Sequence, residues 1–390
     1  MKVLVAGGAG YIGSHAVYEL LRAGHDVVVF DNLSTGRRSA VPNAAQFVQG
    51  DIRNINDLNA VFKEQAAQES GPIDVAMHFA AKLIVPESVT EPLAYYDNNV
   101  CGLRTMLESM VQNDIKNVVF SSTAAVYGEP DKPICHEDDN NLPINPYGET
   151  KLACERMIKW VAAAHDMNYA IFRYFNVAGA DESLTIGLDK DQLTHLIPLI
   201  MQTALGLRDK LSIFGNDYET PDGTCIRDYI HVTDLAQAHV LGAEYITGMP
   251  GTSIGYSAAY SIWADDNNNN DSDTSNGTCG GDSDKTDDKT GGSGGANVGS
   301  GKTATSKTKG RSIIANLGSG KGYSVAEVVN AAKQMFDFDF EYAPRRPGDP
   351  AKLTADITRA REQLGWEPQL SLEEMLKSDY DYRKKLAQQK

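Results

Sequence analysis

The sequence predicts an α/β fold in which a parallel, doubly wound sheet is followed by a smaller mixed α/β domain. Short apolar, β-rich runs alternate with segments of helical periodicity through about the first 178 residues, which is typical of right-handed βαβ units. A glycine-rich turn directly follows the first of these runs. The chain has 390 residues, of which 42% are hydrophobic, so it is large enough for two or three domains.

Five apolar runs are predicted to form buried strands of the sheet: residues 3–6, 27–30, 75–79, 118–120 and 170–172. The segment 14–23 between the first two runs is predicted to be helical. Its Val17, Leu20 and Leu21 fall on one helix face, and Gly24 follows as a stop signal. Strands and helices of these lengths in alternation predict the doubly wound sheet.

Beyond residue 178 the pattern is less regular. We expect residues 1–178 to bind a dinucleotide and residues 179–390 to form mainly a substrate-binding domain, with some segments returning to the first. Helices are predicted at residues 195–204, 232–246, 324–335, 358–364 and 372–385. Residues 264–312 contain no Leu, Ile, Met, Phe, Trp or Tyr. Such a tract buries too little apolar surface to offset its ordering entropy, so we expect a disordered insertion there.

Composition excludes several classes of partner. The 52 acidic and 36 basic residues leave a formal net charge of −16, which repels nucleic-acid phosphates and anionic lipid surfaces. The chain has no apolar run of about eighteen residues, and its first apolar stretch is too short for a signal peptide. The five cysteines include no CxxC pair, which favours a reducing compartment and disfavours a zinc site. We therefore expect a cytoplasmic protein with no metal, nucleic acid or membrane.

The glycine-rich turn has the pattern of a dinucleotide-binding loop. Residues 7–13 read GGAGYIG and open a predicted helix. A pyrophosphate needs a close backbone approach and a helix N-terminus, and both require residues without a Cβ. Gly7, Gly10 and Gly13 meet this requirement. The turn therefore predicts a bound dinucleotide.

The residues at the ends of other predicted strands favour NAD over NADP as the dinucleotide. Asp31 ends the second strand, where a carboxylate accepts hydrogen bonds from the ribose 2′-hydroxyl and repels a 2′-phosphate. Arg37 and Arg38 lie nearby and weaken this preference over NADP. Residues 51–52 and 79–80 follow two further strands, so the cofactor is expected to lie across the carboxyl edge of the sheet.

Three further residues form a predicted proton-transfer set. Tyr147 and Lys151 are four residues apart on a predicted helix, so the phenol and the ammonium can address one point. A positive charge beside a phenol favours its ionised form. Thr123 follows the strand at 118–120 and can hold the substrate oxygen beside Tyr147. Together they predict oxidation of a secondary alcohol, with hydride passing to a nicotinamide.

These motifs, in this order, resemble the UDP-glucose 4-epimerase family in the extended branch of the short-chain dehydrogenase/reductase superfamily, which has a Rossmann-type sheet. The resemblance runs from residue 1 to about 251 and resumes at 313. Besides the glycine-rich turn it rests on GDIR (50–53), YYDNNV (95–100), SSTAAVYG (121–128), YGETK (147–151), RYFN (173–176), FGNDY (214–218), DGT (222–224), RDYIHV (227–232) and PRRPGD (344–349).

The resemblance implies a tightly held NAD and a UDP-sugar site. The implied NAD contacts are Tyr11, Ile12, Asp31, Asn32, Asp51, Ile52, Phe79, Ala80, Asn98, Tyr147, Lys151 and Phe175. The implied substrate contacts are Thr123, Asn176, Leu196, Phe214, Arg227, Arg346 and Asp349. The implied activity interconverts UDP-galactose and UDP-glucose: Tyr147 takes the proton of the sugar 4-hydroxyl, and hydride leaves C4 for the nicotinamide and returns to the opposite face. A homodimer through helices at residues 92–112 and 147–164 is also implied.

Two departures and three alternatives accompany this interpretation. Thr123 stands where the family usually has Ser, and Leu353 borders the implied sugar pocket, so N-acetylated and uronic UDP-sugars stay open as substrates. A nucleotide-sugar 4,6-dehydratase is disfavoured, because Ala124 and Ala125 carry no titratable atom where it needs an acid and a base. A non-catalytic NAD-binding scaffold is disfavoured by the intact Tyr and Lys.

Overall fold

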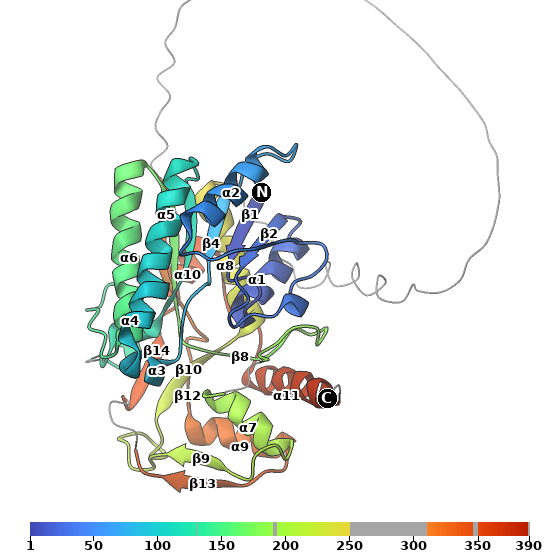
Figure 1. The fold of residues 1–390 in the computed structure, drawn as a ribbon. Helices are drawn as coiled ribbons and strands as arrows, with labels where there is room; N and C mark the ends of the chain where they lie inside the picture. The colour runs from blue at the N-terminus through green and yellow to red at the C-terminus, as the bar shows by residue number, and fades with distance from the viewer. Residues whose placement is uncertain (131, 190–192, 250–309, 346–349, 389–390) are drawn as a thin grey trace, which may run out of the picture. The chain divides into compact units, whose positions relative to one another are not determined.

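The computed structural model describes residues 1–130, 132–189, 193–249, 310–345 and 350–388. Its largest element is a seven-stranded sheet, all parallel, in the order β11-β7-β5-β4-β1-β2-β3 (Figure 1). The strands are β1 (Lys2–Ala6), β2 (Asp26–Asp31), β3 (Gln46–Gln49), β4 (Val75–His78), β5 (Asn117–Thr123), β7 (Asn168–Tyr174) and β11 (Ile313–Leu317). The chain moves outward in opposite directions from β1, so the predicted doubly wound class is confirmed. Residues 264–309 of the expected insertion lie outside the described residues.

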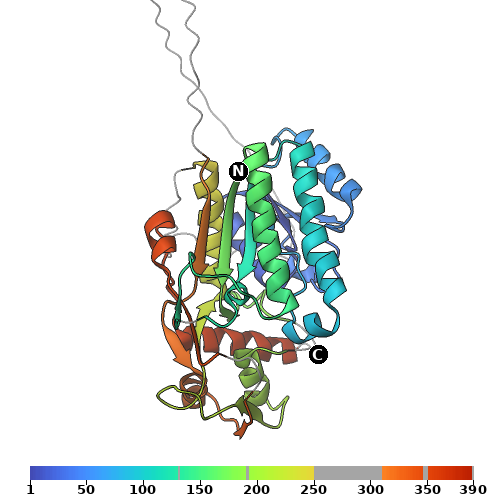
Figure 2. The same ribbon diagram turned by 90° about the vertical axis from the view of Figure 1, so that its left-hand side faces the viewer.

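Helices cover both faces of the large sheet (Figures 1 and 2). On one face lie α2 (Ile55–Ala66), α5 (Gly102–Gln112) and α6 (Pro146–His165). On the other face lie α1 (Tyr11–Arg22), α8 (Val232–Thr247) and α10 (Thr358–Leu364). The first layer buries Leu4, Phe30, Phe62 and Leu103 in one apolar cluster. Full burial of such a side chain contributes about 1.5–3 kcal/mol.

A smaller assembly follows the carboxyl end of β7. Its central strand is β10 (Ile226–His231), which pairs in parallel with β8 (Asn176–Ala178) and β14 (Lys352–Ala355) and antiparallel with β12 (Gly322–Ser324). β14 also pairs with β6 (Ile134–Cys135), and β9 (Leu211–Phe214) pairs with β13 (Phe340–Ala343). Helices α7 (Leu196–Ala204), α9 (Val325–Met335) and α11 (Leu372–Gln388) share an apolar core with these strands.

The two halves of the chain exchange elements. β11, α8 and α10 all follow residue 178 and complete the large sheet and one of its helix layers. In return β6, which precedes residue 178, joins the smaller sheet. Long-range strand pairing therefore joins the two halves of the chain.

Helix ends explain where the structure differs from the pattern. α1 begins at Tyr11, three residues before the predicted start, because Gly10 is its N-cap and the glycine-rich turn is compact. α6 begins at Pro146, since the Asn145 side chain accepts a hydrogen bond from Gly148 N (2.9 Å) and caps the helix. In the described part of the chain, none of the helices combines the length and the apolar character needed to span a bilayer.

Candidate active site

The glycine-rich turn between β1 and α1 has a backbone that only glycine can form. Gly7 has a φ of +84°, and a Cβ there would lie 2.5 Å from Ala80 N. A Cβ at Gly13 would overlap the carbonyl oxygen of Gly7. α1 begins at Tyr11, and its N-cap residue Gly10 has no side chain to cap it, so the first-turn N–H groups are available to an anion. The turn fits the pyrophosphate of a dinucleotide.

Asp31 is fixed beside this turn by backbone hydrogen bonds. Ala9 N donates to Oδ2 (3.0 Å), and Leu33 N donates to Oδ1 (2.8 Å). The side chain is buried, with 8% of its surface exposed. A carboxylate has about four lone-pair sites, so two accepted bonds leave capacity for ribose hydroxyls. The structure therefore places Asp31 beside the glycine-rich turn, with acceptor sites left on its carboxylate.

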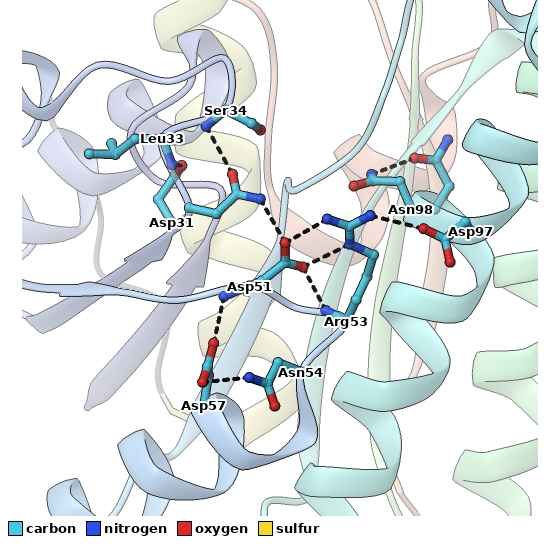
Figure 3. A network of polar contacts seen from close by, with 11 residues as sticks. Asp31, Leu33, Ser34, Asp51, Arg53, Asn54, Asp57, Asp97 and Asn98 are labelled. Atoms are coloured by element: carbon cyan, nitrogen blue, oxygen red, sulfur yellow. Dashed lines mark hydrogen bonds and ion pairs between the residues drawn. The ribbon is translucent and has the colours of Figure 1, made fainter.

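A charged network joins Asp51 to the helix layer (Figure 3). Its carboxylate accepts bonds from Arg53 Nε (3.0 Å) and Nη2 (2.7 Å) and from Asn32 Nδ2 (3.1 Å). Arg53 Nη1 donates to Asp97 Oδ2 (2.9 Å), beside Asn98 in the π-helix η2 (Tyr96–Cys101). The bonds from Arg53 hold the pKa of Asp51 well below its usual range. The network brings Asn32, Asp51 and Asn98 into one region; the sequence motif contained Arg53 but no sign of this role.

The remaining predicted NAD contacts surround the same edge. Ala80 lies against the glycine-rich turn, and the ring of Phe79 packs 4.9 Å from His239 of α8. Ile52 is buried against the start of α5. Phe175 is buried between β7 and β8. All four follow strands of the large sheet, in agreement with a ligand along its carboxyl edge.

A cavity of about 270 Å³ opens beside the glycine-rich turn. Gly10 and Tyr11 line one side, and Tyr382 and Lys385 of α11 line another. Arg37 also lines it and pairs through Nε with Asp189 Oδ2 (3.0 Å). α11 therefore lies over the N-terminal end of α1, a position that the sequence pattern did not indicate.

β5 and α6 bring the predicted proton-transfer set together. The hydroxyls of Thr123 and Tyr147 share a hydrogen bond, and Lys151 Nζ donates to Ser121 O (2.8 Å). Thr123, Tyr147 and Lys151 are all buried, with exposures of 9%, 8% and 2%. The three side chains therefore meet at the carboxyl end of β5, close to the centre of the sheet.

Burial dominates the electrostatics of this set. It raises the pKa of Tyr147 to about 12, although the bond with Thr123 acts in the opposite direction. Burial also lowers the pKa of Lys151 to about 8. We expected Lys151 to lower the pKa of Tyr147, but the effects that set this pKa in the structure are burial, which raises it, and the bond with Thr123, which lowers it. The phenol is therefore protonated at neutral pH.

The opposite face of β5 carries a buried polar chain. Ser121 Oγ donates to His239 Nε2 (3.0 Å), because His239 Nδ1 donates to Leu235 O (2.8 Å). Burial lowers the pKa of His239 to about 4, so the ring is neutral. Ser121 also shares a hydrogen bond with Tyr174. Sequence analysis did not find this chain, since its members are far apart in the sequence.

Two of the predicted substrate residues line one small cavity. Asn176 of β8 and Leu196 of α7 border it together with His195 and Tyr229. Asn176 Nδ2 donates to the backbone oxygen of Asp228 (2.9 Å). The structure therefore brings Asn176 and Leu196 together across the start of the smaller assembly.

The other predicted substrate residues are more scattered. Arg227 lies on β10, two residues before Tyr229, and its Nη1 donates to Ile226 O (2.9 Å). Phe214 ends β9 and is not among the residues that line the small cavity. Arg346 and Asp349 lie outside the described residues.

Asp228 is a structural anchor that the sequence pattern did not reveal. Its fully buried carboxylate accepts bonds from Ser319 N (2.6 Å), Ser319 Oγ (2.7 Å), Gly320 N (3.2 Å) and Ala355 N (3.0 Å). Burial raises the pKa of Asp228 to about 6, although these hydrogen bonds act to lower it. The carboxylate fixes the loop after β11 to β10 and β14, next to Arg227.

Comparison with known proteins gives consistent matches. The NAD dependent epimerase/dehydratase family matches residues 3–253, and the GDP-mannose 4,6 dehydratase family matches residues 289–378. The chain is 41% identical over 387 residues to the UDP-glucose 4-epimerase of Halalkalibacterium halodurans, covering 98% of this chain and 96% of that protein.

Two solved structures extend the comparison to the fold. A crystal structure of UDP-glucose 4-epimerase has a TM-score of 0.80 and 39% identity, with 99% of this chain and 98% of that chain covered. UDP-glucose 4-epimerase from Brucella ovis in complex with NAD has a TM-score of 0.79 and 36% identity, with 98% of each chain covered.

We predict that Gly13→Ala removes the bound dinucleotide, because the added Cβ overlaps Gly7 O and forces the turn open. The measurement is the amount of nucleotide that each purified variant releases on denaturation, which we expect to fall several-fold. Gly24→Ala is the control: its Cβ meets open space and its φ of +78° costs only about 1 kcal/mol of backbone strain. A Gly13→Ala protein that keeps its full nucleotide content would contradict the assignment of the turn.

Proposed function

The chain belongs to the NAD-dependent epimerase/dehydratase family, and we propose that it interconverts UDP-galactose and UDP-glucose with a tightly held NAD. The observation that carries this proposal is the meeting of Thr123, Tyr147 and Lys151 at the carboxyl end of β5. This set lies on the same sheet edge as the glycine-rich turn and Asp31. An alcohol bound there has a proton acceptor on one side and the dinucleotide site on the other.

Each member of the set has a separate task. Tyr147 takes the proton of the sugar 4-hydroxyl, and Thr123 holds the substrate oxygen through its hydroxyl. Lys151 donates one of its three N–H groups to Ser121 O, so two remain that can donate to the ribose of the cofactor. NAD supplies a hydride acceptor and a positive charge when it is bound. Burial keeps water away from the reacting atoms and strengthens every charge interaction among them.

The residues of the cofactor site suit a molecule that is retained between turnovers. The first-turn N–H groups of α1 would hold the pyrophosphate, and Asp31 would hold a ribose. Asn32, Asp51, Ile52 and Asn98 would contact the cofactor on one side of the glycine-rich turn. Phe79, Ala80 and Phe175 would contact it along the sheet edge. Retention fits an isomerisation, because hydride returns to the sugar and no net oxidation occurs.

The residues of the substrate side suit a nucleotide diphosphate. Arg227 and Arg346 are proposed to form bidentate bonds with the pyrophosphate, which offsets the acidic background of the chain locally. Asn176, Leu196, Phe214 and Asp349 complete the proposed UDP-sugar site. Support comes from the shared cavity of Asn176 and Leu196 and from the resemblance of the sequence motifs.

We also propose a cytoplasmic location. Cys101, Cys135, Cys154 and Cys225, the cysteines of the described residues, are free thiols. Free buried thiols beside an exposed one are typical of proteins in reducing compartments.

We predict that the purified protein converts UDP-galactose to UDP-glucose without added NAD. Tyr147→Phe removes the proton acceptor and lowers kcat by about 100- to 10,000-fold. Tyr169→Phe, the same change at the half-buried ring of β7 far from the set, keeps activity near that of the parent. Product formation is followed by separating the two UDP-sugars, with UDP-N-acetylglucosamine and UDP-glucuronic acid tested alongside. Full activity of Tyr147→Phe, or turnover of neither hexose, overturns the proposal.

The hydroxyl of Thr123 has its own test. Thr123→Ser keeps the bond to Tyr147, and kcat should change by no more than a few-fold. Thr123→Val keeps the shape but loses the hydroxyl, and we expect kcat to fall at least about tenfold. Equal kcat values for the two variants would remove Thr123 from the mechanism.

We further propose a homodimer formed through helices of the α5 and α6 layer. Exposed apolar side chains lie there: Val89 of α3 (Val85–Thr90) is 61% exposed, Leu93 of α4 (Pro92–Tyr95) is 83% exposed and Trp160 of α6 is 78% exposed. α3, α4 and α5 all contact α6. A closed dimer buries the same surface of both copies.

The test is the mass of the protein in solution by light scattering. We expect the parent at about twice the 42.3 kDa of one chain, and the variant Leu93→Asp/Trp160→Lys at the mass of one chain. Leu207→Asp, at a position that is 62% exposed in another part of the chain, should leave the mass unchanged. A parent protein with the mass of one chain would refute the dimer without affecting the proposed activity.

A further inference from the structure

The carboxyl end of β5 is tied to α6 by three successive residues. The backbone oxygen of Ser121 accepts from Lys151, and the hydroxyl of Thr123 binds Tyr147. Between them, Ser122 Oγ donates to Glu155 Oε1 at 2.6 Å. Tyr147, Lys151 and Glu155 follow one another at intervals of four, so they share one face of the helix. The middle contact, the hydrogen bond from Ser122 to Glu155, involves a carboxylate that has no other role in the proposed chemistry.

Glu155 belongs to a fully buried ion pair. Arg173 donates to it twice, through Nε (2.9 Å) and Nη2 (2.6 Å), and the two side chains are 0% and 1% exposed. This is the bidentate geometry that makes Arg–carboxylate pairs strong and directional. Arg173 of β7 lies directly opposite Ser122 of β5 in the sheet. The carboxylate therefore clamps two neighbouring strands to the helix above them.

The row continues across the next strand. Asn316 of β11 lies opposite Arg173, so Ser122, Arg173 and Asn316 point to the same face of the sheet. Arg173 Nη1 donates to Tyr127 OH (3.1 Å), and Tyr127 OH donates to Asn316 Oδ1 (2.6 Å). Arg173 Nη1 also donates to Glu137 O (3.0 Å), so each nitrogen of the guanidinium has a partner. The network fixes Arg173 and, through it, the carboxylate of Glu155.

Stability alone does not account for this network. Burying two charges costs several kcal/mol each, and an apolar pair of equal volume is often as stable or more so. The same helix layer packs an apolar cluster that includes Cys154, Ile158 and Ala162 of α6. The ion pair fixes how β5 and α6 are aligned. A bidentate carboxylate permits only one register between the strand and the helix, whereas apolar contacts permit several.

We propose that Glu155, held by Arg173, is a positioning residue for the proton-transfer set. It holds Ser122, and so keeps Thr123 in contact with Tyr147 and the Ser121 carbonyl in contact with Lys151. This inference rests on the proposed function, since it assigns a task within that reaction. Loss of the tie lets the end of β5 shift against α6, which separates the alcohol, the phenol and the ammonium by fractions of an ångström.

The charge of Glu155 also acts on Lys151. The titratable groups that face Lys151 are His78 of β4 and, on its own helix, Cys154 and Glu155. Burial lowers the pKa of His78 to about 3 and raises the pKa of Cys154 to about 12, so both are neutral near pH 7. Glu155 is the partner of Arg173 in the buried ion pair. Its carboxylate favours the protonated ammonium.

The first experiment removes the tie and leaves the ion pair intact. Ser122→Ala deletes one hydroxyl, and we expect kcat to fall about tenfold, because misplacing reacting groups by up to about 1 Å costs as much as 100-fold. The KM for UDP-galactose and the nucleotide content should stay within twofold of the parent. Ser109→Ala is the matched control: this buried hydroxyl donates to Asn59 (2.7 Å) in the α2 and α5 layer, and its loss should leave kcat unchanged.

The second experiment tests the charge. Glu155→Gln removes the carboxylate that favours protonated Lys151, so the alkaline side of the kcat profile moves to lower pH. Ser122→Ala keeps that charge, and its profile keeps the position of the parent. A merely structural effect on folding lowers both rates without moving either profile. Thermal unfolding of each variant shows whether Glu155→Gln folds. If it does not fold, the kcat of Ser122→Ala alone tests whether Glu155 is a positioning residue.

The outcomes separate this inference from the proposed function. If Ser122→Ala retains the kcat of Ser109→Ala while Tyr147→Phe is inactive, Glu155 has no positioning task and the epimerase proposal stands. If Tyr147→Phe is active, the proposed function itself is overturned, and the inference that rests on it is overturned with it. A tenfold loss confined to kcat in Ser122→Ala, with the pH shift confined to Glu155→Gln, supports the inference.

Discussion

The structure depends on one constraint: the end of β5 must stay in fixed register with α6. A phenol and an ammonium one helical turn apart are common and have no chemical use by themselves. Here Tyr147 and Lys151 have a chemical use because they contact Thr123 and the Ser121 carbonyl at the end of β5. β5 lies near the centre of the sheet, and the glycine-rich turn follows β1, two strands away. Strand pairing, helix packing and the buried ion pair all act on this register.

Burial has two consequences at this site. It raises the pKa of Tyr147 and lowers that of Lys151, so it works against the charged forms that the reaction uses. It also excludes water and lowers the local dielectric, so a nearby positive charge acts far more strongly than it would in solvent. The phenol alone is thus neutral near pH 7, and a cationic partner beside it would favour its ionised form. The chain's acidic net charge has little effect at this short range.

Much of the fold could be predicted from the sequence, since the signals were local. Apolar runs marked five of the seven strands of the large sheet, all but β3 and β11, and the glycine-rich turn and the Tyr–Lys spacing are each contained in a few residues. Partners that are distant in the chain left no such pattern: Arg173 with Glu155, Asn316 with Tyr127, and Asp228 with the loop after β11. Their pairing is set by strand order, which periodicity does not encode. For the same reason the position of α11 over the glycine-rich turn was not foreseen.

In the proposed reaction, hydrogen leaves the sugar C4, is kept within the protein, and returns to the same carbon. The most direct test uses UDP-galactose that carries deuterium at C4, converted in ordinary water with unlabelled NAD added in excess. The UDP-glucose formed should keep its deuterium at C4, and none should appear in the added nucleotide. Loss of the label to water, or its transfer to the free nucleotide pool, would rule out return of the hydrogen within one protein molecule.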